Sequence, residues 1–188
     1  MRQLTEEETR TLFEKLANYV GRGLNELIAP PSGSEDPNER YVFRMHQMRV
    51  YHVKLGLVGL ATSIPRDNLL SLGTCVGKFT KTGKFRIQIT ALDLLAPHAR
   101  YKVHIKPNGT QPFLYGGNVL KAHVGRWSED CPEHAGVVVV DMNDTPLGFG
   151  VTARSSAESR KLDPTAICVF SQSDIGNYLR DEDTLFTT

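Results

Sequence analysis

The stretch at residues 135–153, AGVVVVDMNDTPLGFGVTA, decides how the second half of the chain is interpreted. It holds an apolar run, Gly136–Met142, then a turn rich in Asn, Asp and Pro, then a second run, Leu147–Ala153. Short apolar runs bounded by turn formers are typical of buried strands. Gly148 and Gly150 lie inside the second run, where glycine indicates close packing or a bulge. The stretch therefore predicts two strands of a tightly packed β-structure.

Short apolar segments continue on both sides of this stretch. Tyr101–Ile105 alternates like a strand, and Ala166–Phe170 forms another compact apolar run. Between them we expect a turn at Pro107–Gly109 and a short helix at Asn118–Ala122. Short strands separated by Gly and Pro turns fit a small closed barrel, which removes exposed sheet edges.

The first half of the chain has a different pattern. Thr5–Glu8 is a capping box, and the apolar repeat after it predicts a helix over Glu6–Val20. The other expected elements are two short helices and a helical turn, an exposed loop and four strands: helices at Leu24–Ile28 and Leu55–Ala61, a helical turn at Ala91–Leu95, a loop at Pro31–Arg40, and strands at Tyr41–Met45, Arg49–Val53, Leu69–Val76 and Phe85–Thr90. We therefore predict an α+β chain, with an antiparallel α/β domain at 1–94 and the barrel, followed by a C-terminal helix or tail, at 95–188.

Charge is strongly segregated along the chain, although the formal net charge is only +1. Residues 1–39 hold four basic and eight acidic residues, which gives −4. Residues 40–126 hold fourteen basic and two acidic residues, which gives +12, and residues 127–188 hold four and eleven, which gives −7. A basic middle between acidic ends is typical of a protein that binds a polyanion.

The sharpest basic run is Gly77–Arg86, GKFTKTGKFR. Its glycines predict a hairpin with a tight turn near Lys81–Gly83. Strand alternation would place Lys84 and Arg86 on one face and Phe85 with Ile87 on the other. Such a cationic face can neutralise phosphates. The alternative is an ordinary solvated strand face, and the wider basic excess favours RNA.

The sequence carries no pattern typical of catalysis, metal binding or membrane insertion. The three cysteines show no CxxC spacing, and the six histidines show no paired-ligand spacing. No phosphate-binding glycine motif or nucleophile elbow occurs. The first ten residues carry three glutamates and no apolar core of a signal peptide. We therefore expect a non-enzymatic intracellular protein with no cofactor, no metal and no membrane contact.

Several long blocks, taken together and in order, resemble one protein family. They are MRQLTEEETRTLFEKL, LGTCVGKFTKTGKFRIQITALDLLAPHARYKVHIKP, FLYGGNVLKAHVGR, PLGFGV and SDIGNYLRDEDTLF. The family is that of the large-subunit ribosome-biogenesis factors that carry a C-terminal PUA domain, a small β-barrel. The resemblance covers almost the whole chain. Two segments depart from it, the long loop Pro31–Arg40 and the segment Tyr51–Pro65.

The resemblance implies a PUA-type barrel and a set of RNA contacts. In PUA domains the RNA lies against a glycine-containing loop, which matches Phe113–Lys121 here, and against a late strand. Glycines without Cβ let the backbone approach a phosphate, and the start of a following helix can bind an anion. Tyr115 is the better candidate for base stacking, whereas Trp127 is more typical of a core residue. With the basic hairpin, the predicted RNA-binding residues are Lys78, Lys81, Lys84, Arg86, Lys102, Lys106, Tyr115, Gly116, Gly117, Lys121, Arg154, Arg160 and Lys161.

The same resemblance implies a place of action and partners. We expect pre-ribosomal RNA of the large subunit, proteins of the pre-ribosomal particle and, among these, a nucleolar rRNA cytosine methyltransferase. The expected location is the nucleolus and nucleus with some protein in the cytoplasm, and the chain is expected to be monomeric outside the particle. Two other hypotheses stay open: a protein–protein adaptor with secondary RNA contact, favoured by the acidic segment Asp181–Asp183 and the diluted basic patch after Leu147–Ala153, and an RNA-modifying enzyme.

Overall fold

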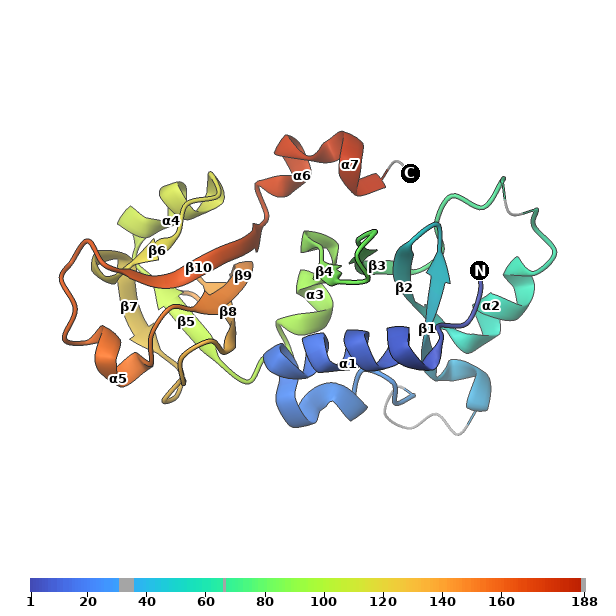
Figure 1. The fold of residues 1–188 in the computed structure, drawn as a ribbon, viewed down its shortest axis with the longest axis horizontal. Helices are drawn as coiled ribbons and strands as arrows, with labels where there is room; N and C mark the ends of the chain where they lie inside the picture. The colour runs from blue at the N-terminus through green and yellow to red at the C-terminus, as the bar shows by residue number, and fades with distance from the viewer. Residues whose placement is uncertain (31–35, 66, 187–188) are drawn as a thin grey trace. The chain divides into compact units, whose positions relative to one another are not determined.

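The computed structural model describes residues 1–30, 36–65 and 67–186. It divides into two compact units (Figure 1). Unit 1 holds Met1–Ala17 and Arg22–Ala91, and unit 2 holds Asn18–Gly21 and Leu92–Thr188. Helices and antiparallel strands share each unit, so the predicted α+β class is confirmed. The domain division at 94/95 stays a prediction.

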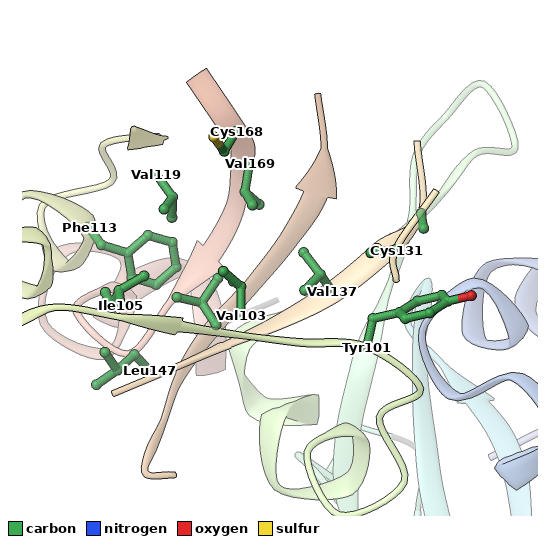
Figure 2. Close-up of a cluster of buried hydrophobic side chains, with 12 residues drawn as sticks. Tyr101, Val103, Ile105, Phe113, Val119, Cys131, Val137, Leu147, Cys168 and Val169 are labelled. Atoms are coloured by element: carbon green, nitrogen blue, oxygen red, sulfur yellow. The ribbon is translucent and has the colours of Figure 1, made fainter. Parts of the chain in front are cut away.

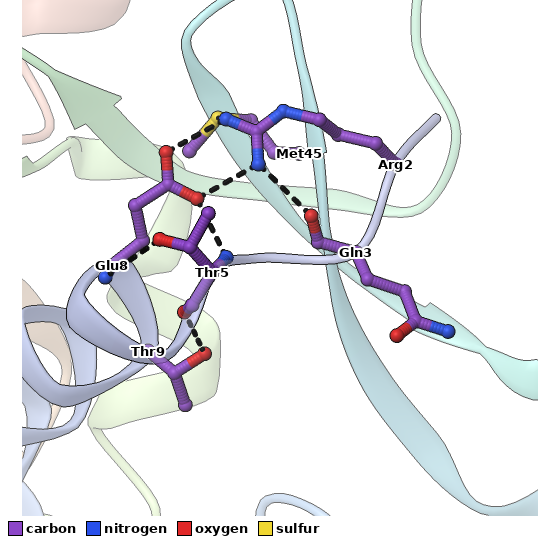
Figure 3. A network of polar contacts seen from close by, with 6 residues as sticks. All are labelled: Arg2, Gln3, Thr5, Glu8, Thr9 and Met45. Atoms are coloured by element: carbon purple, nitrogen blue, oxygen red, sulfur yellow. Dashed lines mark hydrogen bonds and ion pairs between the residues drawn. The ribbon is translucent and has the colours of Figure 1, made fainter.

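The helix α1, Glu6–Val20, begins at the capping box, as the sequence predicts. The Thr5 N–H donates to Glu8 Oε2 at 2.8 Å, and the Glu8 N–H donates to Thr5 Oγ1 at 3.3 Å. Arg2 adds a bidentate contact, because its two terminal nitrogens donate to the Glu8 carboxylate at 2.8 and 2.7 Å (Figure 3). An isolated antiparallel bridge between Arg2 and Met45 ties the chain start to the first strand.

Unit 1 is built on sheet A, in which four strands follow one another in the order β1-β2-β3-β4, all antiparallel. The strands are β1 (Tyr41–His46), β2 (Arg49–Lys54), β3 (Thr74–Phe79) and β4 (Phe85–Ile87). The predicted helix at Leu55–Ala61 is confirmed as α2. The remaining elements are short: η1 (Gly21–Asn25), η2 (Pro37–Glu39) and η3 (Ile89–Ala91).

Three predictions of elements in unit 1 need correction. The helix expected at Leu24–Ile28 is wrong, because a 3-10 turn over Gly21–Asn25 takes its place. The strand expected at Leu69–Val76 begins only at Thr74, and the one expected at Phe85–Thr90 ends at Ile87. Apolar content alone suggested longer strands, but strands end where the pairing partner ends. Of the expected loop, residues 31–35 lie outside the described residues.

Unit 2 is built on sheet B, with strand order β6-β10-β9-β8-β5-β7 (Figure 1). Its strands are β5 (Lys102–Ile105), β6 (Val119–Leu120), β7 (Val124–Trp127), β8 (Gly136–Val140), β9 (Pro146–Thr152) and β10 (Ile167–Asp174). The pairs are antiparallel except β5 with β8, which is parallel. Its helical elements are α3 (Leu92–Leu95), α4 (Pro107–Leu114), η4 (Lys121–His123), α5 (Ser156–Ser159), α6 (Asn177–Arg180) and α7 (Glu182–Phe186).

Two local predictions in unit 2 are wrong. The expected turn at Pro107–Gly109 is the first turn of α4, where Pro107 occupies a position that needs no N–H donor. The expected helix at Asn118–Ala122 is instead β6 followed by the 3-10 turn η4. In both places the burial of one apolar side chain, Phe113 in α4 and Val119 in β6, overrides the local glycine and proline signals.

The core of unit 2 gathers side chains from the strands and from α4. Figure 2 shows Phe113 meeting Ile105, Val103 and Val119 inside the curved sheet. Gly148 and Gly150 are required by this packing, since an added Cβ would lie 2.3 Å from the carbonyl oxygen of a β10 residue in each case. The interpretation of these glycines as close-packing positions is confirmed. Sheet B curls into a nearly closed barrel whose end strands are β6 and β7.

Candidate nucleic-acid interface

A row of basic residues crosses sheet A from strand to strand. His46 on β1 lies opposite Arg49 on β2, Arg49 lies opposite Lys78 on β3, and Lys78 lies opposite Arg86 on β4. Directly opposed residues project from the same face of a sheet. We call these four residues, three cations and a histidine, the cationic row. Like charges placed directly opposite each other destabilise a sheet, so the row is the kind of arrangement that a polyanion would stabilise.

Exposure rises along the cationic row toward β4. His46 and Arg49 are buried, Lys78 is half-buried and Arg86 is exposed. The Arg49 guanidinium donates to Gln88 Oε1 at 3.2 Å, which fixes its position in the sheet. Lys78 and Arg86 therefore present their charge to solvent beside an anchored guanidinium.

The hairpin that carries these cations forms as the sequence predicts. The Thr80 N–H donates to the Lys84 carbonyl at 2.8 Å, and Gly83 takes a φ of 75° that suits glycine. Phe85 is buried while Lys84 and Arg86 are exposed, so the predicted alternation is confirmed. Lys81 is exposed in the turn. The structure thus brings four of the predicted RNA-binding cations onto one hairpin.

The glycine loop of unit 2 has a different geometry from the expected anion site. Gly116 and Gly117 follow the end of α4, and their N–H groups donate to the carbonyls of Phe113 and Pro112. A strand and not a helix comes next, so the expected helix start that would bind an anion is wrong. Helix C-terminal ends disfavour anions. The glycines are explained by capping, because Gly116 has a φ of 85° and a Cβ on Gly117 would lie 2.7 Å from the Pro112 carbonyl oxygen.

The remaining predicted cations of unit 2 are partly engaged within the protein. The Lys121 ammonium donates to the carbonyls of Arg160 and Leu162, which ties η4 to the end of α5. Arg154 contacts Glu133 at 3.2 Å. Of the predicted side chains in unit 2, those of Lys106, Tyr115, Arg154, Arg160 and Lys161 are exposed, and that of Lys102 is half-buried. Tyr115 is 75% exposed, as a base-stacking residue needs to be.

Arg49 and His46 belong to the site geometrically but were missed in the sequence. Arg49 precedes Lys78 by many residues, and only the strand register joins them. The signal was present in part, since Arg49 begins a predicted strand, whereas His46 directly follows the predicted strand Tyr41–Met45 and proves to be the last residue of β1. No sequence pattern gives the register of β2 against β3, which also contains an irregularity between Val50 and Tyr51.

Three of the described titratable residues make contacts within the protein or are buried in it. His52 Nε2 lies 2.6 Å from the Leu27 carbonyl, and burial lowers the pKa of its imidazole. His104 lies 2.5 Å from the Asp144 carboxylate, which lowers the pKa of Asp144. Burial raises the pKa of the Cys131 thiol to about 11. Within the described residues no group of three or more His, Cys, Asp or Glu side chains gathers as a metal site would require. None of the described helices is long and apolar enough to span a membrane.

Comparison with known proteins defines the class of the chain. Residues 101–183 match the family described as the UPF0113 PUA domain, and residues 1–89 match the NIP7/UPF0113 pre-PUA domain. A crystal structure of a PUA domain from Aeropyrum pernix K1 superposes with a TM-score of 0.55 at 17% identity, covering 95% of this chain and 87% of that one. The chain therefore carries a pre-PUA domain followed by a PUA domain, which confirms the predicted PUA-type barrel.

Two relatives place the chain more closely. It is 62% identical over 187 residues, with all of both chains covered, to the 60S ribosome subunit biogenesis protein NIP7 of Saccharomyces cerevisiae. It is 59% identical over 186 residues to the protein of the same description in Schizosaccharomyces pombe, with 99% of this chain and 100% of that one covered. The chain belongs to the NIP7 family, which confirms the resemblance read from the sequence.

Proposed function

We propose that the protein is a non-catalytic RNA-binding assembly factor of the large ribosomal subunit, needed for pre-rRNA processing. The observation that carries the proposal is the cationic row, in which Lys78 and Arg86 face solvent beside the anchored Arg49. Relatives described as 60S ribosome subunit biogenesis proteins supply the biological setting. The RNA that it binds is then pre-ribosomal RNA. The protein acts in the nucleolus and nucleus, with some of it in the cytoplasm.

The mechanism follows from the chemistry of the row. Lysine and arginine contacts to phosphates fix the register of a strand but do not read its sequence. A row of cations crossing the strands spans several ångströms per strand, since neighbouring strands lie roughly 4.8 Å apart. It can therefore follow a sugar–phosphate backbone. The protein clamps single-stranded or irregular rRNA and holds it while other factors act.

Unit 2 contributes a second contact in this proposal. Tyr115 offers an exposed ring for stacking, and Lys106, Arg160 and Lys161 offer exposed charges. The backbone N–H groups of the glycine loop already serve as helix caps, so side chains carry this contact. Gly116 and Gly117 keep the loop compact beside Tyr115.

A second candidate function is a protein–protein adaptor within the pre-ribosomal particle. It is favoured by the engagement of Lys121 and Arg154 in contacts within the protein, which lowers the charge available for RNA. In that case particle proteins, including a nucleolar rRNA cytosine methyltransferase, are the main partners. The protein remains a monomer outside the particle in both functions.

In vivo protein–RNA crosslinking with sequencing tests the proposal. The unchanged chain is compared with a Lys78→Ala/Lys84→Ala/Arg86→Ala variant and with a matched Arg10→Ala control, whose exposed side chain lies on α1. We expect crosslinks to precursor large-subunit rRNA that fall in the triple variant and persist in the control. Absence of rRNA crosslinks from the unchanged chain, with the protein still present on pre-ribosomes, would favour the adaptor function.

A further inference from the structure

A groove of about 570 Å³ opens in unit 1 beside the turn between β1 and β2. Its described lining includes three of the four methionines of the chain, Met1, Met45 and Met48, together with Ile64 and Leu69. Met48 is 50% exposed and Ile64 is 45% exposed, whereas Leu69 is buried. We call this feature the hairpin groove. Methionine-rich apolar surfaces are typical of protein–protein contacts, because the thioether side chain adapts to different shapes.

The turn at one end of the hairpin groove is held in an unfavourable conformation. Gln47 and Met48 have φ angles of 47° and 64°, so both occupy the left-handed region. A two-residue hairpin turn of this kind favours Asn-Gly. The Phe79 N–H donates to the Met48 carbonyl at 2.8 Å and fixes the turn. Met48 lines the groove and is half exposed, and strained residues of this kind cluster at functional sites.

A buried polar atom adds a second, independent observation. His46 lines the hairpin groove with only 3% of its surface exposed, and its Nε2 has no hydrogen-bond partner among the described residues. A buried donor or acceptor without a partner is costly, and native structures contain few of them. Two imidazole nitrogens of unit 2, His104 Nδ1 and His123 Nδ1, also have no partner among the described residues, but of the three atoms only His46 Nε2 belongs to a residue that lines this groove and can there bond a ligand. Met45 and Met48, with three rotatable bonds each, can give way to that ligand.

The basic residues of the groove and the absence of acidic ones from its described lining indicate the chemistry of the ligand. His46 is the first member of the cationic row, and of the described residues that line the groove none is acidic. Arg2 also lines the groove, but both terminal nitrogens of its guanidinium donate to the Glu8 carboxylate. They are therefore not available for a bidentate contact with a phosphate. A second copy of the chain would bring two cationic rows together, which like charges oppose. An apolar lining with a basic end fits a partner peptide that carries both aliphatic and acidic side chains.

We propose that the hairpin groove docks an acidic–aliphatic segment of a partner protein. An aliphatic side chain of that segment inserts between Met48 and Ile64, and a neighbouring carboxylate accepts a hydrogen bond from His46 Nε2. This site is separate from phosphate binding by Lys78 and Arg86 and does not depend on the proposed RNA function.

Peptide display on the full chain tests the proposal. A random-peptide library is selected on the unchanged protein, and the enriched peptides are measured on three variants. Met48→Gly removes the side chain while its φ suits glycine, so the fold is not at risk. Ile64→Asp places an acid at the mouth, and Leu60→Asp is its matched control, because Leu60 is 72% exposed outside the lining. We expect acidic–aliphatic peptides that bind about tenfold more weakly to Met48→Gly and to Ile64→Asp, but not to Leu60→Asp.

Methionine methyl resonances locate the bound peptide. The methyls of Met1, Met45 and Met48 should shift on peptide addition, whereas that of Met142 in unit 2 should not. The proposal is overturned if no enriched peptide depends on the groove residues, or if the groove-dependent peptides are basic or uncharged. It is also overturned if a single-stranded RNA oligonucleotide shifts the same three methyls and competes with the peptide.

Discussion

Glu8 shows how much one side chain contributes to the start of α1. The hydrogen bonds from Arg2, followed by that from the Thr5 backbone, lower the pKa of its carboxyl from 4.5 to about 2. A carboxyl with a depressed folded-state pKa stabilises the fold above its unfolded pKa, and this stabilisation is lost as the pH falls toward 2. We expect Glu8→Gln to lower the free energy of unfolding by about 1 kcal/mol at neutral pH.

The pH dependence distinguishes this mechanism from a general loss of helix stability. The stability difference between Glu8→Gln and the unchanged chain should shrink as the pH is lowered from 4.5 toward 2. Urea unfolding followed by circular dichroism at several pH values measures it. Glu6→Gln is the control, because it removes a charge from the same turn but leaves the capping box intact. A difference that stays constant with pH would contradict the role of the ionised carboxylate.

The buried ion pair of Asp174 with Arg180 allows a prediction about stability. Its buried carboxylate accepts hydrogen bonds from Arg180 Nη2 at 2.9 and 2.7 Å and from the Gly176 N–H at 2.9 Å. Arg180 also donates to the Leu114 carbonyl, which joins α6 to the end of α4. Arg180→Met leaves the carboxylate buried without its cation. We expect a loss of about 2 kcal/mol, less than for a fully buried pair because Arg180 is partly exposed. Thermal unfolding measures it, and adding Asp174→Asn should restore part of the loss.

At the scale of strands and helices, two glycines should respond in opposite directions to alanine. A Cβ on Gly150 of β9 would lie 2.3 Å from the Phe170 carbonyl oxygen, so Gly150→Ala should destabilise by about 2 kcal/mol. Gly59 of α2 has nothing within 4 Å of an added Cβ, so Gly59→Ala should stabilise by up to about 1 kcal/mol. Urea midpoints of the two variants test the pair. A stable Gly150→Ala would show that β9 and β10 can separate.

Some helices and strands could be predicted from the sequence, and others could not. The capping box predicted the start of α1, and alternation predicted the faces on which Lys84, Phe85 and Arg86 lie, because both depend on residues a few positions apart. The helix α4 was misread as a turn, since Pro107 and Gly109 resemble turn formers until Phe113 is seen to be buried. The pairing of Arg49 with Lys78 depends on strand register, which packing sets and no local pattern records.

At the scale of the whole molecule, the segregated charge makes a prediction about salt. The segment 40–126 carries twelve excess positive charges, whereas the segments on both sides are acidic. Phosphate contacts release counterions, so the affinity for single-stranded RNA should fall steeply as salt rises. Lys84→Glu should weaken binding to oligonucleotides of different sequence by similar factors, because a phosphate contact does not read bases. It should also lower the salt slope by roughly one unit.

Fluorescence anisotropy over a salt series measures both quantities for several oligonucleotides. Arg10→Glu is the matched control, since it makes the same change of charge on α1, away from the cationic row. If the two variants lose affinity equally, net charge alone controls binding and the row has no special place. If only Lys84→Glu changes the slope, the contact is local to the hairpin. A loss that differs strongly between sequences would instead mean that the hairpin reads bases, because only base contacts discriminate among oligonucleotides of equal charge.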